Sequence, residues 1–243
     1  MTNLDPQCFK KEGYCLFPNV FSEKEVVSNR SLLDEATDSG SLDRANYFGE
    51  PHTLDDRWLG ICRHPRLLDA VQSVLGTNLI LVYSSVFIKP PNSTDTVGWH
   101  QDIAYWPSVH GTDVVTVWLA LDDASAENSA MKVIPETHTG HREQGTVTSE
   151  VHEMLDRKTV ITPEMEAKAV TLEMSAGSLS IHDSYLQHSS EANRTERRRA
   201  GYTIRFCNRD TVSIDLEQHP IPVYLVRGQA AEDRYVDIRP LAI

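Results

Sequence analysis

The stretch LILVYSSVFIKP, residues 79–90, decides the fold, because it is rich in β-branched and aromatic residues and runs into the turn residues Pro90, Pro91 and Asn92. Such a segment predicts a β-strand bounded by a turn. More short stretches of the same kind follow: DVVTVWLALDD (113–123), AMKVIP (130–135), GSLSIHD (177–183) and RAGYTIRFCNR (199–209). Several short strands over about 130 residues predict a sandwich or jelly roll with helices outside.

Helical signals precede these strands, over residues 6–80. Ser22 has the character of a helix N-cap, and Glu25, three residues later, completes the pattern of a capping box. The segment HPRLLDAVQSVLG, residues 64–76, contains a proline near its start, has apolar residues at helical spacing and ends at a glycine. We therefore expect the N-terminal third of the chain to be helix-rich.

The whole chain, residues 1–243, is expected to form one domain, because the length suits a single large β or α/β unit. The jelly-roll core is expected over residues 79–209, with an interruption at 141–172. Within the interruption, TSEVHEMLDRKTV (148–160) suits a short helix or a lid over the mouth of a barrel. A plain surface insertion is the alternative.

The charge of the chain limits its partners. Lys and Arg number 23, Asp and Glu number 35, and the net charge is −12. An acidic chain repels phosphate backbones, which argues against nucleic acid or an anionic membrane as the main partner. No apolar run approaches the roughly 18 residues of a membrane span, and no apolar signal core begins the chain. The cysteines show no C-x-x-C spacing and are expected to be reduced thiols of a cytoplasmic protein: Cys8, Cys15, Cys62 and Cys207.

Two segments offer residues for metal chemistry. In WHQDIAYWP, residues 99–107, His100 and Asp102 are two positions apart, so in a strand both side chains lie on one face. This spacing alone also suits a surface hydrogen-bonded pair. The segment HDSYLQHSSEANRTERRRAGYTIRF, residues 182–206, adds histidines and an arginine that enters a strand. Two histidines and one carboxylate on one octahedral face suit a mononuclear iron oxygenase, and a guanidinium suits the far carboxylate of a keto acid.

Three stretches in order, GWHQDIAYWP, VWLALDDASAENSAMKVIPETH and HSSEANRTERRRA, resemble the phytanoyl-CoA dioxygenase family. FKKEGYCLFPNVFSEKEV near the N-terminus also resembles the start of this family, so the likeness covers most of the chain. The resemblance implies a mainly β fold with flanking helices and a double-stranded β-helix core, that is, a cupin-like jelly roll. It also implies Fe(II), 2-oxoglutarate as cosubstrate and O₂.

Carried over residue by residue, the family's iron ligands fall on His100, Asp102 and His188. The resemblance places the 2-oxoglutarate carboxylate at Arg199, eleven residues after His188, with Trp118 and Ser190 beside the cosubstrate. His182 competes for the role of distal ligand. In an unbroken strand six residues span about 20 Å, so His182 and His188 are not expected to bind the same ion. The match to the family favours His188.

Substrate contacts are expected from a further set of residues: Gln101, Lys89, Tyr105, Trp106 and Arg205. Gln101 lies between two of the proposed ligands. Its alternative role is to contact a residue that supports the ligands instead of the substrate. Lys89 shares strand parity with residues 83, 85 and 87, and a surface position is its alternative. Arg205 shares parity with Arg199, so it faces either the barrel interior or a salt bridge at the rim. Tyr105 and Trp106 suit a cavity wall or plain aromatic packing.

The expected function is an Fe(II)- and 2-oxoglutarate-dependent dioxygenase that hydroxylates or otherwise oxidises a small-molecule metabolite, with release of succinate and CO₂. A natural-product or amino-acid-like intermediate is the expected substrate. An acyl-CoA hydroxylase is an alternative, in which the basic cluster Arg194, Arg197, Arg198 and Arg199 would grip phosphate. A non-catalytic, metal-binding jelly-roll protein is another. The sequence leaves open whether the protein is a monomer or a homodimer.

Overall fold

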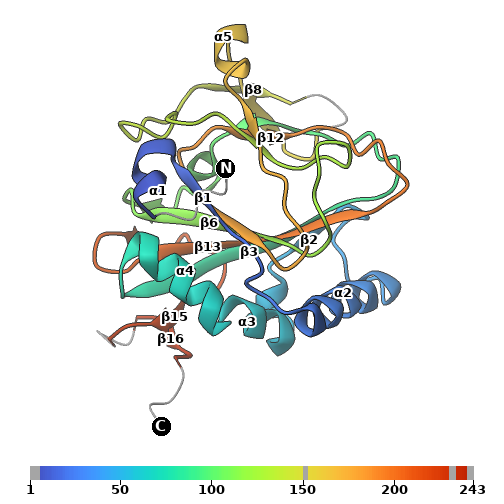
Figure 1. The fold of residues 1–243 in the computed structure, drawn as a ribbon. Coiled ribbons are helices and arrows are strands. Elements are labelled where there is room, and N and C mark those ends of the chain that lie inside the picture. Colours follow the sequence, from blue (N-terminus) through green and yellow to red (C-terminus); the bar gives the residue numbers. More distant parts are fainter. Residues whose placement is uncertain (1–5, 150–152, 230–233, 240–243) are drawn as a thin grey trace.

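Two β-sheets of unequal size face each other in the computed structural model, which describes residues 6–149, 153–229 and 234–239. Helices cover the outer face of the larger sheet, and the smaller sheet, which contains β12, lies on its other side (Figure 1). The predicted mainly β architecture with flanking helices is confirmed.

The larger sheet is antiparallel except where its last two strands pair in parallel. In spatial order it contains β1 (Tyr14–Phe17), β11 (Leu179–Asp183), β6 (Val114–Ala120), β13 (Arg199–Asn208), β3 (Leu79–Lys89), β15 (Tyr224–Arg227) and β16 (Val236–Asp237), and β2 (Tyr47–Gly49) also pairs with β3. The smaller sheet has the order β10 (Val170–Thr171), β7 (Lys132–Val133), β12 (His188–Ser190) and β4 (Val97–His100).

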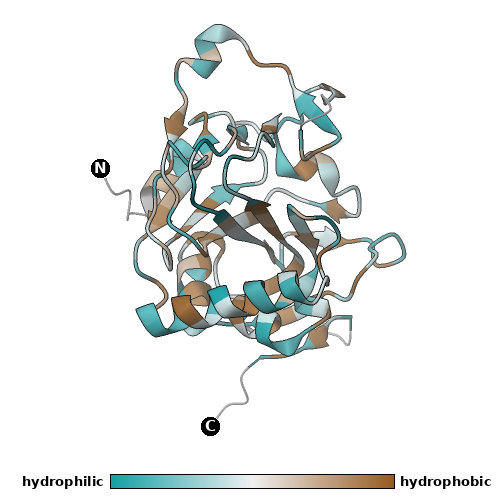
Figure 2. Ribbon diagram, turned by 90° about the vertical axis from the view of Figure 1, so that its right-hand side faces the viewer, coloured by the Kyte–Doolittle hydropathy of each residue, from teal (hydrophilic) through white to brown (hydrophobic). Residues whose placement is uncertain are grey.

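Three helices form the layer beneath the larger sheet: α2 (Glu23–Asp38), α3 (Asp56–Cys62) and α4 (Pro65–Leu75). Figure 2 shows them along the base of the molecule with hydrophobic and hydrophilic residues alternating along their length. The predicted capping box at Ser22 is confirmed, because Glu25 accepts a hydrogen bond from the Ser22 backbone at 2.7 Å. Helix α4 ends at Gly76, whose φ of 87° favours glycine. A shorter helix, α1 (Pro6–Glu12), precedes β1.

Strand β13 separates the hydrophobic core from the interior between the sheets. Ala200, Tyr202, Ile204 and Phe206 belong to the core that packs against the helices. The alternate residues Arg199, Thr203 and Arg205 border the space on the other face. Because side chains in a strand alternate between faces, this single strand contributes both to the core and to the site described below.

The interruption at 141–172, for which we expected a short helix, a lid or a plain surface insertion, contains a small hairpin. Two short strands, β8 (Thr146–Thr148) and β9 (Arg157–Thr159), pair with each other, and a single helical turn, α5 (Pro163–Glu166), follows. Thr and Val at the start of the hairpin favour strand pairing over helix. Residues 150–152 of the segment 148–160 lie outside the described residues.

The remaining short elements are β5 (Val109–His110), β14 (Ser213–Ile214), and the 3₁₀ turns η1 (Pro51–Thr53) and η2 (Asp102–Tyr105). In the described parts of the chain, no helix combines the length and apolarity that crossing a membrane requires.

Candidate metal centre and cavity

His100 and His188 lie directly opposite each other in the pairing of β4 with β12, and their ring centroids are 4.0 Å apart. Nδ1 of His100 lies 2.9 Å from the carbonyl oxygen of Gly98, and Nδ1 of His188 lies 2.9 Å from that of Leu186. A carbonyl oxygen can only accept a hydrogen bond, so each Nδ1 carries the proton. Each Nε2 therefore keeps the free lone pair that a metal ligand requires.

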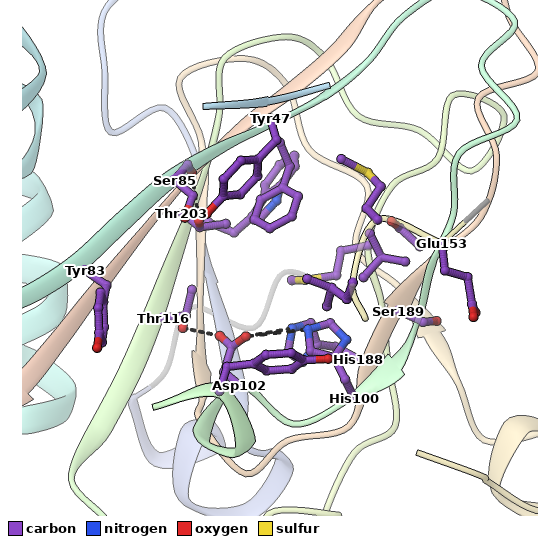
Figure 3. A pocket seen from close by; sticks show the side chains of 18 of the residues that line it. Tyr47, Tyr83, Ser85, His100, Asp102, Thr116, Glu153, His188, Ser189 and Thr203 are labelled. Atoms are coloured by element: carbon purple, nitrogen blue, oxygen red, sulfur yellow. Dashed lines mark hydrogen bonds and ion pairs between the residues drawn. The ribbon is translucent and has the colours of Figure 1, made fainter. Parts of the chain in front are cut away.

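Asp102 completes the cluster from the first position of η2, just beyond β4. Its Oδ1 lies 3.5 Å from Nε2 of His100 and 3.6 Å from Nε2 of His188. Its Oδ2 faces the other way, where it accepts a hydrogen bond from the hydroxyl of Thr116 and lies 3.5 Å from Nε2 of His182. Oδ1 is therefore the carboxylate oxygen that converges with the two imidazoles, as Figure 3 shows from close by.

The electrostatics of the cluster suit a cation. Burial alone would raise the pKa of Asp102, but its interactions with His188, His100 and His182 hold the pKa well below its usual range. Burial lowers the pKa of His188 far below the usual value, and the nearby His100 lowers it further. The carboxylate is thus ionised and His188 is neutral, and both are the forms that bind a metal.

One ligand atom from each of His100, Asp102 and His188 can be chosen so that all lie within 4.8 Å of one another, and all three residues are buried. Two imidazoles and one carboxylate match the ligand set of non-haem Fe(II) oxygenases. His182 lies outside this set. Both of its ring nitrogens are buried without a hydrogen-bond partner among the described residues, and it faces the oxygen of Asp102 turned away from the two ligand imidazoles.

A pair of buried cations lies near the metal centre. Lys89 donates hydrogen bonds to the hydroxyls of Ser129 and Ser190, each at 2.8 Å, and to the carbonyl of Glu191. Arg199 donates to the same two hydroxyls, at 3.1 Å and 3.3 Å. Neither cation forms an ion pair within the described residues, and Nε of Arg199 is buried without a partner. Two desolvated positive charges without a counter-ion predict an anion site.

The pKa values of this pair show the cost of burying it. Burial lowers the pKa of Lys89 well below its usual value, and the charge of Arg199 lowers it further. Burial also lowers the pKa of Arg199, to about 10. A bound dicarboxylate would reverse both effects by supplying the missing negative charge.

Trp118 lines the cavity and lies beside this anion site. The guanidinium carbon of Arg199 lies 5.6 Å from the centroid of the Trp118 ring. The indole lies against the backbone of Gly201, where an added Cβ would come within 2.2 Å of the ring. Glycine at position 201 is therefore what lets the tryptophan lie flat beside Arg199.

A cavity of about 800 Å³ connects these features. The His100–Asp102–His188 cluster, Arg199 and Ser190 border it, as do Tyr83, Ser85 and Arg205 at its other end. Figure 3 shows Tyr47, Ser85 and Thr203 across the cavity from the histidine–aspartate cluster. Residues 148, 149 and 154–156, beside and within the β8–β9 hairpin, also line it, so the interruption of the core borders the site.

The structure places the predicted substrate residues in different surroundings. Tyr105, Trp106 and Arg205 line the cavity. Of the two positions expected for Arg205, the barrel interior and a salt bridge at the rim, the structure shows the interior. Lys89 belongs to the anion site beside Arg199. Gln101 points away from the cavity, because its amide donates to the carbonyls of Tyr185 and Arg142 and accepts from the backbone of Gln144.

Sequence reasoning missed Ser129, Thr116 and Glu50. Ser129 belongs to a loop and has a φ of 78°, and no local pattern predicts that it reaches Lys89 and Arg199. Thr116 lies on the strand of Trp118 with the same parity, which is the one signal that could have placed its side chain on the cavity face. Glu50 comes from the helix-rich segment, where we expected no site residue.

Comparison with known proteins gives a consistent result. The model of the phytanoyl-CoA dioxygenase (PhyH) family matches residues 9–201. A probable phytanoyl-CoA dioxygenase of Caenorhabditis elegans is 28% identical in a match 162 positions long, which covers 61% of this chain and 50% of that protein. A probable alpha-ketoglutarate-dependent hypophosphite dioxygenase of Stutzerimonas stutzeri is 27% identical in a match 219 positions long, which covers 82% of this chain and 76% of that protein. The chain spans about half the length of the phytanoyl-CoA dioxygenase that it matches.

Solved structures share the fold. The apo form of the non-haem monooxygenase ThoJ is 24% identical with a TM-score of 0.80, covering 98% of this chain and 88% of ThoJ. The epimerase SnoN in complex with Fe³⁺, alpha-ketoglutarate and nogalamycin RO is 19% identical with a TM-score of 0.74, covering 95% of this chain and 96% of SnoN. The expected jelly-roll fold is thus confirmed.

Proposed function

The chain belongs to the phytanoyl-CoA dioxygenase family of iron- and 2-oxoglutarate-dependent oxygenases, and from this premise we propose that it oxidises a small molecule held in the cavity. The main support is one arrangement: a buried pair of histidines with an ionised carboxylate lies near a pair of buried cations that form no ion pair with the residues the structure describes. The first suits iron and the second suits the cosubstrate.

His100, Asp102 and His188 would hold the iron, with Oδ1 of Asp102 as the carboxylate ligand. Bound there with 2-oxoglutarate and O₂, iron supplies the oxidation of a substrate C–H bond and the release of succinate and CO₂. The backbone carbonyls at Gly98 and Leu186 fix both imidazole rings, and Thr116 fixes the carboxylate. The protein's own part is therefore orientation rather than acid–base chemistry.

Arg199 and Lys89 would bind the far carboxylate of 2-oxoglutarate. The hydroxyls of Ser129 and Ser190 hold both cations in place, and the Trp118 ring covers the guanidinium. SnoN, which shares the fold, was solved with Fe³⁺ and alpha-ketoglutarate, which supports the same pair of cofactors for this chain. A site with fixed, desolvated cations binds a dicarboxylate selectively over a keto acid that lacks the second carboxylate.

A small substrate is favoured over an acyl-CoA. The basic cluster that would have gripped phosphate is dispersed, because Arg198 forms ion pairs with Asp34 at 2.5 Å and Asp122 at 2.8 Å, while Arg199 faces the cavity. A cavity of about 800 Å³ has room for the cosubstrate and a metabolite of modest size.

An anaerobic titration tests the proposal. Fe(II) and 2-oxoglutarate added to the wild-type protein are expected to give the weak visible charge-transfer band of a chelated keto acid. Arg199→Ala is expected to weaken the band at equal 2-oxoglutarate concentration, whereas Arg197→Ala, an exposed arginine two residues earlier, leaves it unchanged. Iron loading is measured separately. An iron-loaded wild type without a band would overturn the proposal and favour a metal-binding protein without turnover.

A further inference from the structure

Arg205 is a second buried guanidinium of the cavity, and it too forms no ion pair with any residue that the structure describes, although its charge acts on Glu50 and Asp102. It is 7% exposed and lies on β13 with the same parity as Arg199. Its Nη1 donates to the hydroxyl of Ser85 at 2.9 Å, and its guanidinium carbon lies 5.6 Å from the centroid of the Trp106 ring. Its Nε is buried and finds no acceptor among the described residues. This edge of the guanidinium is free to bind a carboxylate.

Glu50 borders the same end of the cavity with the opposite charge. Its Oε2 accepts a hydrogen bond from the backbone of Ser84 at 2.9 Å, and its side chain is 27% exposed. Nδ1 of His52 lies 3.5 Å from that oxygen, but burial lowers the pKa of His52 to about 4, so the histidine is neutral. Burial raises the pKa of Glu50 to about 7, although the hydrogen bond from Ser84 and the positive charge of Arg205 partly offset this rise.

The two charges are anchored on neighbouring residues of β3 but do not meet. Ser84 holds Glu50 and Ser85 holds Arg205, and no ion pair joins the two charged groups in the described structure. The hydroxyl of Tyr47 also reaches Ser85, at 3.3 Å, and Figure 3 shows both on the wall opposite the metal cluster. Opposite charges fixed on one wall, each with other partners, are complementary to a ligand that carries both charges.

This wall adjoins the metal centre. Arg205 lies opposite Thr116 in the pairing of β13 with β6, and Thr116 donates to Asp102. Tyr83, which pairs with Arg205 from β3, stacks on Trp106 with ring centroids 5.9 Å apart. A ligand bound by Arg205 is thus enclosed by aromatic rings and lies beside the carboxylate that would hold the iron.

We propose that Arg205 and Glu50 form a zwitterion subsite, in which Arg205 binds the carboxylate and Glu50 binds the ammonium group of an amino-acid-type substrate. The subsite rests on the proposed oxygenase function and specifies its substrate class. The other charged side chains near this wall are engaged or exposed: Arg44 is exposed and lies over the Tyr47 ring, and Asp43 accepts from the backbone of Gly49. A dianionic phosphate ester would meet the repulsion of Glu50.

Calorimetry on the anaerobic protein loaded with Fe(II) and 2-oxoglutarate tests the subsite. The probes are free L-amino acids, their carboxamides, which lack the carboxylate, and their N-acetyl derivatives, which lack the ammonium group. At least one free amino acid is expected to bind, with both blocked forms at least about tenfold weaker. Arg205→Met and Glu50→Gln are each expected to weaken that binding by about tenfold to a hundredfold. Arg197→Ala is the matched control.

Each outcome separates the subsite from the oxygenase function. A normal charge-transfer band with no binding of any free amino acid overturns the subsite and leaves the proposed function intact. Equal binding of the N-acetyl derivatives overturns the role of Glu50, and equal binding of the carboxamides overturns that of Arg205. Loss of the band in wild type removes both proposals. Arg205→Lys, which keeps the charge, is expected to bind more tightly than Arg205→Met, which excludes misfolding as the cause of a weak variant.

Discussion

Lys89 and Arg199 lie directly opposite each other in the pairing of β3 with β13, and both donate to the hydroxyls of Ser129 and Ser190. Like charges across a strand pair destabilise a sheet, and here both are also desolvated. An anion is expected to bind between these two cations. Because it would offset their repulsion, it should stabilise the protein as well as complete the site.

Binding of 2-oxoglutarate is therefore expected to raise the melting temperature of the iron-loaded, anaerobic protein. At a concentration of 100 times the Kd, the stabilisation is about 2.7 kcal/mol, or roughly 5–10 °C for a chain of this size. The control is 2-oxobutanoate, which has the keto acid group but no far carboxylate to meet Lys89 and Arg199. An equal shift with 2-oxobutanoate would contradict the anion site.

Thr116→Val is expected to weaken iron binding by about tenfold to a hundredfold while the protein stays folded, because the hydroxyl that orients Asp102 is lost and the shape is kept. Asp102→Ala removes the ligand itself and therefore sets the lower limit of the affinity for iron. The Kd for Fe(II) is measured under anaerobic conditions, with circular dichroism as the check on folding. Wild-type affinity in Thr116→Val would show that Asp102 needs no support from β6.

Glu50→Gln is expected to stabilise the protein above neutral pH and to have little effect at pH 5. The raised pKa means that the folded state holds the Glu50 proton more tightly than the unfolded chain does. The contribution of the Glu50 proton to the stability of the fold is fully present below the pKa of the unfolded chain, near 4.5. It is lost as the pH rises through the folded pKa of about 7. Since the side chain is 27% exposed, the expected gain at pH 8.5 is about 2 kcal/mol. Urea unfolding of both proteins at the two pH values measures it, and a gain independent of pH would refute the assignment.

Gly201→Ala is expected to lower both stability and 2-oxoglutarate affinity, because its Cβ would come within 2.2 Å of the Trp118 ring. Overpacking of this kind costs about 1–3 kcal/mol, and the displaced indole no longer covers Arg199. Gly60→Ala is the matched control, since the space around Gly60 is open and alanine favours helix α3. Denaturant unfolding and cosubstrate titration of both variants test the prediction. An unchanged 2-oxoglutarate affinity in Gly201→Ala would show that the position of Trp118 does not matter.

The strands were predictable because each is a short β-rich run between turn residues, and β13 carries its core side chains on one face and Arg199, Thr203 and Arg205 on the other. Alternation placed these last three on one face without any knowledge of the neighbours. The His100–Asp102 pair was accessible as two residues of one segment, but Asp102 lies in the turn η2 after β4 and not in the strand that the spacing argument assumed.

The rest of the site depends on distant pairing. That Ser129 reaches Lys89, or that Thr116 reaches Asp102, follows from the register between strands far apart in the sequence, which local patterns do not contain. Gln101 is a further example. Its position between two ligands in the sequence suggested a side chain in the cavity, but hydrogen bonds to the backbone of residues 142 and 144 hold its amide outside the cavity. For the 148–160 segment the local pattern left a short helix, a lid and a surface insertion open, and it gave no sign of the pairing between β8 and β9.

Arg199 and Arg205 stand six residues apart on β13, which corresponds to about 20 Å along an extended strand. If one anchors the cosubstrate and the other the substrate head group, the backbone itself fixes the interval between them. The carbon that faces the iron is then selected by its number of bonds from the charged head, so the regioselectivity of the oxidation becomes a property of strand length.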